Sequence, residues 1–369
     1  YLGENKMKCK ILTVVLVFSI LMSFSFSVTA QANSTFTTFR SGVNYLSSSN
    51  RFYQADSITE ADFAFFKDNG ITDLSIRIFW RSITEDPNVI DNYKRLLGVA
   101  DKYGLNVQLD FWTRFTDDTD WARPEFLTSI FQIIRDPDVK LQWLDFVADT
   151  MHELKQFNCI KSWTMMNEPF IKELTDTALF YDCWSQQREL MKSIDSRPLS
   201  IRFSLGDSPW SEDFSKTEAF KVCDYIAINE YLDPSNSSYT RYSSTWDMFN
   251  ECVLDCTMAS KQLVISEFGS DTGDDEAKRL WYERSLELFR EKGIPQAYAW
   301  CWQTTNPTTE RFNIYPGTPA FFELSEAAGQ NVSSPSLNVN IDTNRDRYTK
   351  WSYVCVTVTA ADRISLIPL

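Results

Sequence analysis

The chain has 369 residues, of which 43% are hydrophobic and 15% aromatic, and its formal net charge is −14. This length and apolar content are enough for one large domain, while the acidic surface argues against nucleic acid or an anionic membrane as a partner. The single histidine, His152, leaves no basis for a histidine-rich zinc site or a Ser-His-Asp triad. Any chemistry must therefore use carboxylates, hydroxyls, amides or cysteines.

Residues 7–32 have the pattern of a secretory signal peptide. Lys8 and Lys10 form a basic start, an apolar run covers 11–28, and residues 30–32 are a small-x-small cleavage site. We therefore expect a secreted, extracellular protein. The apolar run is also long enough to act as an uncleaved anchor, which would hold the chain on a membrane and facing outside.

The cysteines do not form an evident disulfide framework. One of the eight, Cys9, lies in the predicted signal, and an odd number follows at irregular spacing. In an exported protein, both disulfides and buried free thiols are compatible with this pattern.

Three segments run from a helix end through a glycine to a strand that ends in tryptophan: residues 65–80, 100–112 and 289–302. Glycine suits the left-handed position that follows many helices, and the apolar or alternating residues after it are typical of strands. A helix–glycine–strand unit that recurs is half of a strand–helix repeat, and such repeats build parallel sheets.

The whole pattern predicts an α/β protein. Strands are expected at residues 41–46, 74–80, 105–112, 161–167, 198–204, 223–231, 262–267 and 296–302. Helical spacing of apolar residues covers 138–156 and 276–291. Together they predict a (β/α)8 TIM barrel over residues 36–330, whereas the alternative, a doubly wound open sheet, lacks a glycine-rich phosphate loop after the first strand. Residues 334–369 predict a short β-rich C-terminal extension.

Two of the predicted strands end in a glutamate. Glu168 follows the apolar run 163–166, and Glu267 follows the run 263–265. Catalytic groups of such barrels lie at the C-terminal ends of the strands, and an unpaired buried carboxylate is too costly to keep without a use. The structural alternative is that each glutamate caps a helix or pairs with an arginine. Two carboxyl groups that face each other across a cleft, one protonated and one ionised, are what cleavage of a glycosidic bond requires.

The strand motifs, taken in order, resemble those of a known family. They are "SGVNY", "LSIRIFW", "WTMMNEP", "INEY", "VISEFG" and "YAWCW". Their order and spacing from Phe39 to Ala328 are similar to those of clan A glycoside hydrolases, most of all to glycoside hydrolase family 5, the cellulase and mannanase family. The resemblance implies a retaining hydrolase of a β-linked polysaccharide, of β-glucan or mannan type. It needs no cofactor and no metal, and we expect a monomer whose partner is a polysaccharide or oligosaccharide.

The resemblance also implies roles for five residues. Glu168 would be the acid/base and Glu267 the nucleophile. Asn167 would bind the 2-hydroxyl of the sugar, Arg77 would keep Glu267 ionised, and Tyr231 would donate a hydrogen bond to Glu267.

Aromatic residues at the strand ends are expected to contact the sugar, because sugar rings stack their C–H faces on indoles. The resemblance also implies that Trp300 or Trp302 forms the floor under the attacked sugar. Alternation along a strand would put both on one face, and Trp300 fits the family pattern slightly better. Trp80 and Trp112 would lie on the same rim. By the same alternation Asn229 points inward, and Glu230 next to it points into the surrounding helices.

The chain departs from the family pattern where histidines usually stand. The expected places read "DFW" at 110–112 and "NEY" at 229–231, so the substrate preference cannot be carried over. Two other functions stay open: an exo-acting β-glycosidase of the same clan, and a non-catalytic carbohydrate-binding barrel.

Overall fold

The computed structural model describes most of the predicted barrel and part of the C-terminal extension. The described residues are 38–45, 56–86, 88–113, 124–127, 129, 131–169, 177–205, 213–231, 246–302, 310–332, 338–341, 356–360 and 362–365. The predicted signal or anchor, residues 7–32, lies outside them. Over the part of the chain that is described, no helix is both long and apolar enough to cross a membrane.

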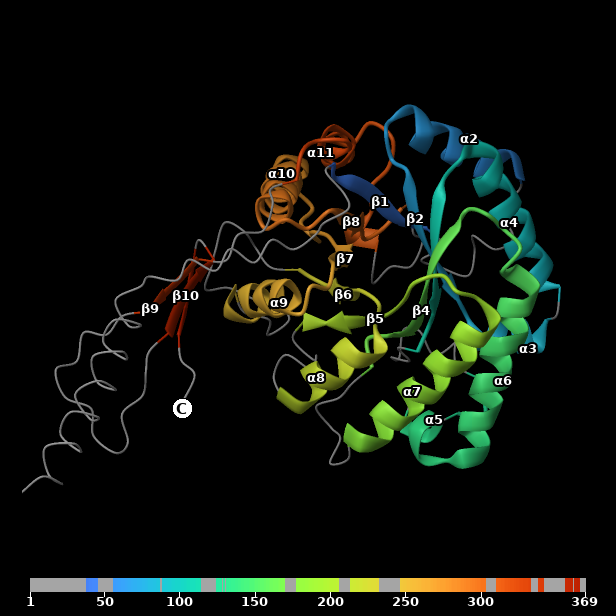
Figure 1. The fold of residues 1–369 in the computed structure, drawn as a ribbon. Coiled ribbons are helices and arrows are strands. Elements are labelled where there is room, and N and C mark those ends of the chain that lie inside the picture. The colour runs from blue at the N-terminus through green and yellow to red at the C-terminus, as the bar shows by residue number, and fades with distance from the viewer. Residues whose placement is uncertain are drawn as a thin grey trace, which may run out of the picture. The chain divides into compact units, whose positions relative to one another are not determined.

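Eight parallel strands close into a barrel in which each strand pairs with the next along the chain, and β8 pairs with β1. The strands are β1 (Arg40–Tyr45), β2 (Asp73–Ile78), β3 (Asn106–Phe111), β4 (Ile160–Asn167), β5 (Leu199–Ser204), β6 (Ile226–Asn229), β7 (Leu263–Phe268) and β8 (Gln296–Ala299). The predicted (β/α)8 barrel is confirmed, and in such a barrel the C-terminal ends of all strands meet at one rim (Figure 1).

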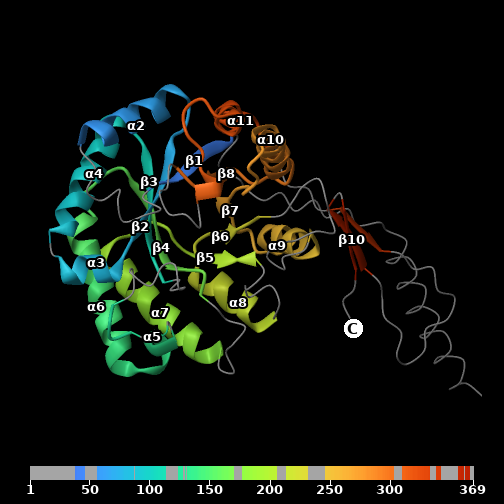
Figure 2. The ribbon, with the colours of Figure 1, turned by 180° about the vertical axis from the view of Figure 1, so that it is seen from behind.

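Helices surround the barrel, as both views show (Figures 1 and 2). They are α2 (Asp56–Asp68), α3 (Trp80–Glu85), α4 (Val89–Tyr103), α5 (Phe131–Arg135), α6 (Pro137–Leu154), α7 (Thr177–Ile194), α8 (Asp213–Val222), α9 (Trp246–Met258), α10 (Asp275–Glu291) and α11 (Pro319–Ala327), with a 3-10 turn at Glu310–Phe312. The two helices predicted at 138–156 and 276–291 correspond to α6 and α10.

The helix–glycine–strand order of these units is confirmed, although none of their strands reaches the tryptophan predicted to end it. Gly104 follows α4 with φ 68°, and Gly293 follows α10 with φ 74°. A side chain at these left-handed positions would be strained, which is why glycine ends each helix and turns the chain into the next strand.

The helix α6 shows how the outer layer is joined to the barrel. The Asp136 side chain accepts hydrogen bonds from the backbone of Asp138 and Val139, which fixes where the helix begins. The apolar face of this helix, which contains Trp143 and Phe146, is buried. These two rings pack against Phe111 at the end of β3. Burial of such rings, at roughly 25 cal/mol per Å² of apolar area, holds the helix against the barrel.

Three predicted strands extend at least two residues beyond the observed C-terminal ends. The strand predicted at 74–80 stops at Ile78, the one at 296–302 stops at Ala299, and the one at 223–231 covers only Ile226–Asn229. After β2 and β8 the next residues are also apolar and buried, so the hydrophobic pattern continues where the strand does not. These errors matter for the tryptophans discussed below.

The C-terminal residues form a separate unit with a small sheet of its own. The strands β9 (Asn338–Ile341), β10 (Val356–Ala360) and β11 (Asp362–Ser365) pair antiparallel in the order β11-β10-β9. All three lie within the stretch 334–369 that the sequence predicts to be β-rich.

The six cysteines that the structure describes are free thiols and all are buried: Cys159, Cys183, Cys223, Cys252, Cys256 and Cys301. Burial raises the pKa of Cys159, Cys183 and Cys223 to about 12. Of the two possibilities that the sequence left open, these residues adopt the free thiol.

We predict that these six thiols do not react with iodoacetamide at pH 8 in the native protein, because they are covered and the thiolate is scarce. Peptide mass spectrometry should find them unlabelled, and fully labelled after unfolding in guanidinium chloride. Rapid native labelling of any of the six would contradict this arrangement.

Candidate active site

The two glutamates lie at the C-terminal ends of β4 and β7, and each side chain is 5% exposed. Glu168 has φ 47°, a left-handed conformation that costs a residue with a side chain about 1–3 kcal/mol. Its backbone N–H donates to the Arg202 carbonyl of β5 at 2.7 Å, which holds it there. Backbone strain of this kind tends to occur at functional sites.

Both carboxylate oxygens of Glu267 accept hydrogen bonds. Arg77 Nη2 donates to Oε1 at 2.6 Å, and the Tyr231 hydroxyl donates to Oε2 at 2.8 Å. A second guanidinium lies close, with Arg202 Nη1 at 3.7 Å from Oε1. Glu267 is therefore held by one charge-assisted hydrogen bond and lies close to two guanidinium groups.

The Arg77 guanidinium lies between two indoles. Its Cζ is 3.7 Å from the centroid of Trp112 and 3.8 Å from that of Trp300. Burial lowers the pKa of Arg77 and the charge of Glu267 opposes that shift; an arginine nevertheless stays protonated. The two rings therefore fix the orientation of the cation that holds Glu267, and both tryptophans belong to the site.

Glu168 has a different neighbour. Asn229 Nδ2 donates to Glu168 Oε1 at 2.7 Å, and Asn229 Oδ1 accepts from the Ser266 hydroxyl at 2.8 Å. Because Ser266 occupies the amide oxygen, the amide nitrogen faces the glutamate. Asn229 thus contacts Glu168, and Tyr231, two residues along, contacts Glu267.

Asn167 lies beside the pair with an unused amide. Its backbone N–H donates to Thr113 Oγ1 at 3.0 Å, and the same hydroxyl donates to the Asn167 carbonyl at 2.9 Å. The side chain is fully buried, and both its amide atoms have no partner among the residues that the structure describes. A buried amide without partners costs free energy, which a ligand hydroxyl would recover.

No group of three His, Cys, Asp or Glu side chains in the described part of the chain is arranged to hold a metal ion. The rim presents two carboxyl groups with different partners, Arg77 and Tyr231 on Glu267 and Asn229 on Glu168.

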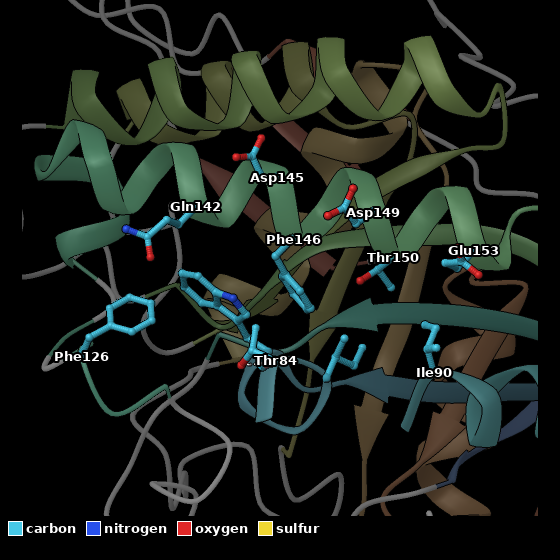
Figure 3. A pocket seen from close by; sticks show the side chains of 11 residues that line it. Thr84, Ile90, Phe126, Gln142, Asp145, Phe146, Asp149, Thr150 and Glu153 are labelled. Atoms are coloured by element: carbon cyan, nitrogen blue, oxygen red, sulfur yellow. Dashed lines mark hydrogen bonds between the residues drawn. The ribbon is translucent and has the colours of Figure 1, made fainter. Parts of the chain in front are cut away.

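Trp80 is not part of the site, contrary to the sequence prediction. The strand β2 ends at Ile78 and Trp80 begins α3, where it stacks on Phe146 at a centroid distance of 5.7 Å. It lines a cavity of about 570 Å³ between α3, α4 and α6. Figure 3 shows this cavity, with Phe126, Phe146 and Thr84 around it. Trp80 therefore belongs to the layer of helices and not to the rim of the barrel.

Trp302 is likewise wrongly predicted as a candidate for the sugar floor. It is fully buried, and its ring lies 4.5 Å from that of Phe66 and 5.8 Å from that of Phe321. The alternation that would align it with Trp300 does not apply, because β8 ends at Ala299; the Trp300–Cys301 peptide bond is cis. Of the two, Trp300 is the one at the site.

Glu230 is buried on the side of the helices. Burial, above all, raises the pKa of Cys252 on α9, and the charge of Glu230 is among the groups that add to the shift. This agrees with the predicted outward direction of Glu230.

Sequence reasoning missed Arg202, which is fully buried on β5 with its Nη1 3.7 Å from Glu267 Oε1. A signal was present: residues 74–77 and 199–202 both read Leu-Ser-Ile-Arg. An arginine inside an apolar strand is costly unless it is paired, so the second copy of this tetrapeptide could have marked a second guanidinium in the barrel.

Solved structures of similar fold are glycoside hydrolases and related proteins. The endo-β-1,4-mannanase of Thermotoga petrophila matches with a TM-score of 0.60 at 14% identity, over 89% of this chain and 84% of its own. GH5_18 from Streptomyces cattleya, solved with GlcNAc, matches with a TM-score of 0.63 at 14% identity, over 79% of this chain and 80% of its own. The endo-1,4-β-mannanase of Rhizomucor miehei matches with a TM-score of 0.61 at 12% identity, over 79% of this chain and 94% of its own.

No protein-family model matches the chain, and no curated protein is similar to it in sequence. At identities this low, the likeness to the solved structures shows the barrel fold that they share with this chain.

We predict that Trp302→Ala lowers the free energy of unfolding by about 3–5 kcal/mol, because it empties a large buried site. Urea unfolding followed by far-UV circular dichroism measures this change. Trp302→Phe should cost clearly less, since it keeps a ring against Phe66. If Trp302→Ala changed stability by less than 1 kcal/mol, the buried placement of this ring would be wrong.

Proposed function

We propose that the protein is a retaining glycoside hydrolase of a β-linked polysaccharide, with Glu267 as nucleophile and Glu168 as acid/base. The observation that carries this proposal is the pair of donors on Glu267. The Arg77 guanidinium and the Tyr231 hydroxyl each bond one carboxylate oxygen, which favours the anion that a nucleophile must be. Glu168 accepts from the neutral Asn229 amide, a partner that suits a group which alternates between acid and base.

The first step breaks the glycosidic bond. Glu168 donates its proton to the oxygen of the leaving sugar, while a Glu267 oxygen attacks the anomeric carbon from the opposite face. The bond between the anomeric carbon and the leaving oxygen breaks as the bond to Glu267 forms. The result is a covalent glycosyl-enzyme with inverted configuration, a leaving sugar released with a free hydroxyl group, and an ionised Glu168.

The second step restores the enzyme. Glu168, now a base, takes a proton from water, and the water oxygen attacks the anomeric carbon as the bond to Glu267 breaks. The second inversion returns the original configuration. Glu168 ends protonated and Glu267 ends as the anion held by Arg77.

The surrounding residues would hold the attacked sugar. The buried, unpartnered Asn167 amide suits the 2-hydroxyl next to the anomeric carbon. Trp300, whose ring covers Arg77, is proposed as the apolar floor for the C–H face of the sugar. Trp112 covers the same guanidinium, so we propose that it supports substrate binding mainly by holding Arg77.

We propose a β-mannan or a β-glucan as the substrate, cut within the chain. The names of the similar solved structures, two of which are endo-β-mannanases, favour mannan. We further propose that the enzyme is secreted, since residues 7–32 have the pattern of a signal peptide. We also propose that it acts as a monomer.

We expect the mature domain to release reducing ends from a β-1,4-mannan or a β-glucan, in a panel that also contains xylan. Chromatography of the products should show oligosaccharides of several lengths, as internal cleavage produces. A monosaccharide as the only early product would favour an exo-acting enzyme. Binding without release, and no difference from Glu267→Gln, would favour a non-catalytic sugar-binding barrel.

We predict that azide distinguishes the roles of the two glutamates on a 2,4-dinitrophenyl β-glycoside of the sugar that the panel identifies. Dinitrophenolate leaves without a proton, so Glu168→Ala should form the covalent intermediate quickly and then stall, because no base activates water. Azide needs no base, and should release the sugar as a β-glycosyl azide with retained configuration.

Glu267→Ala should behave in the opposite way on the same substrate. It has no nucleophile, so the good leaving group alone should not restore turnover, whereas azide in the vacated space should give an α-glycosyl azide by one inversion. NMR of the anomeric proton identifies each product. The reverse pair of anomers would mean that the two roles are exchanged.

A further inference from the structure

The interior of the barrel contains a polar layer just below the two glutamates. Inner layers of such barrels are usually filled by bulky apolar residues, four to a layer, from alternate strands. Here the alternate strands β1, β3 and β5 contribute Asn44, Asp110 and Arg202, all of them buried with 1% exposure or less.

Arg202 lies at the centre of this layer and holds three other strands. Its Nη1 donates to Asp110 Oδ2 at 2.8 Å, and its Nη2 donates to Asn44 Oδ1 at 2.9 Å and to the Ser266 carbonyl. Asn44 Nδ2 donates to the same Ser266 carbonyl at 3.0 Å. The backbone directly before Glu267 is therefore held by two side chains of the layer.

The layer also places a second cation beside Glu267. Arg202 Nη1 is 3.7 Å from Glu267 Oε1, the oxygen that Arg77 bonds. Burial pushes the pKa of Arg202 down, but Asp110 and Glu267 outweigh it and the pKa is raised overall. For Asp110 the effect of burial has the opposite sign: burial raises its pKa, and the nearby charge of Arg202 only partly offsets this. The two guanidiniums thus face two carboxylates, Asp110 and Glu267, inside the barrel.

Stability alone does not account for this layer. Removing two charges from water costs several kcal/mol per ion, and well-packed apolar residues in place of a buried ion pair are often as stable or more stable. Because apolar residues could fill this layer without loss of stability, the buried pair of Asp110 and Arg202 points to a role in the site that contains Glu267.

We propose that Arg202, fixed by Asp110 and Asn44, is a positioning residue that sets the place of Glu267 and holds a second cation beside its carboxylate. This rests on the proposed role of Glu267 as the nucleophile. Arg202 is fully buried and acts on the sugar only through Glu267: it holds the Ser266 carbonyl, which directs the next side chain, and it supplies the second cation near Oε1. Loss of Arg202 should slow formation of the glycosyl-enzyme and leave sugar binding unchanged.

The test uses the full chain and measures covalent labelling of Glu267. The probes are 2,4-dinitrophenyl 2-deoxy-2-fluoro-β-mannoside and the corresponding glucoside, which form a slowly hydrolysed glycosyl-enzyme that intact mass spectrometry detects. The double variant Asp110→Leu/Arg202→Met replaces the pair by apolar residues. We expect it to unfold in urea at the same or a higher concentration than the wild type, and to be labelled at least about 100-fold more slowly at saturating probe, with the probe concentration for half-maximal rate unchanged.

A matched control lies at the opposite end of the barrel. Arg40 and Asp73 form an ion pair where β1 and β2 begin, far from the strand ends that carry the glutamates. The variant Arg40→Met/Asp73→Asn should be labelled at the wild-type rate. Equal slowing in both double variants would show a general effect of barrel ion pairs and would overturn the proposal.

Arg202→Lys tests the geometry at constant charge. A lysine has no planar fork with which to reach Asp110, Asn44 and the Ser266 carbonyl together. We therefore expect a folded variant that is labelled at least 10-fold more slowly. If the double variant does not fold, the result for Arg202→Lys decides. Labelling at the wild-type rate in folded Arg202→Lys and in the folded double variant overturns the positioning role while the proposed function stands. A wild-type enzyme that no probe labels at Glu267 overturns the proposed function, and this inference with it.

Discussion

The ion pair between Arg77 and Glu267 is the contact on which the arrangement of the rim depends. It joins β2 to β7, two strands that are separated by β1 and β8 in the barrel, so it forms only when the sheet has closed. Glu267 then receives its second donor from Tyr231, and Arg77 is held between the rings of Trp112 and Trp300. A buried anion in this position is stable only because every one of these neighbours is in place.

The aromatic residues of the chain serve two different purposes, and their partners tell them apart. Trp80 and Trp302 pack only against other rings and join the helices to the barrel. Trp112 and Trp300 lie over a guanidinium at the rim. An indole over a cation gains both apolar burial and electrostatic attraction, which makes these two rings part of the electrostatics of the site as well as of its shape.

The polar layer below the rim gives the barrel an unusual interior. Asn44, Asp110 and Arg202 replace the apolar side chains that usually fill such a layer, and Arg202 and Asn44 both donate to the Ser266 carbonyl on the strand that carries Glu267. These charged groups lie close to Glu267, the proposed nucleophile. The proposed chemistry is therefore supported from below the site and not only by the residues that face the sugar.

The sequence by itself determined the barrel, its helix–glycine–strand units and the positions of Glu168 and Glu267, because periodic burial and the glycines after α2, α4 and α10 are local properties of the chain. It could not decide where β2 and β8 end, since the apolar pattern continues through Trp80 and Trp302 into other buried surroundings. Nor could it join Arg202 to Asp110 and Asn44, which lie 92 and 158 residues away in the chain. Only the closed barrel brings these groups together, because its strand pairing and not the order of residues sets which side chains meet inside.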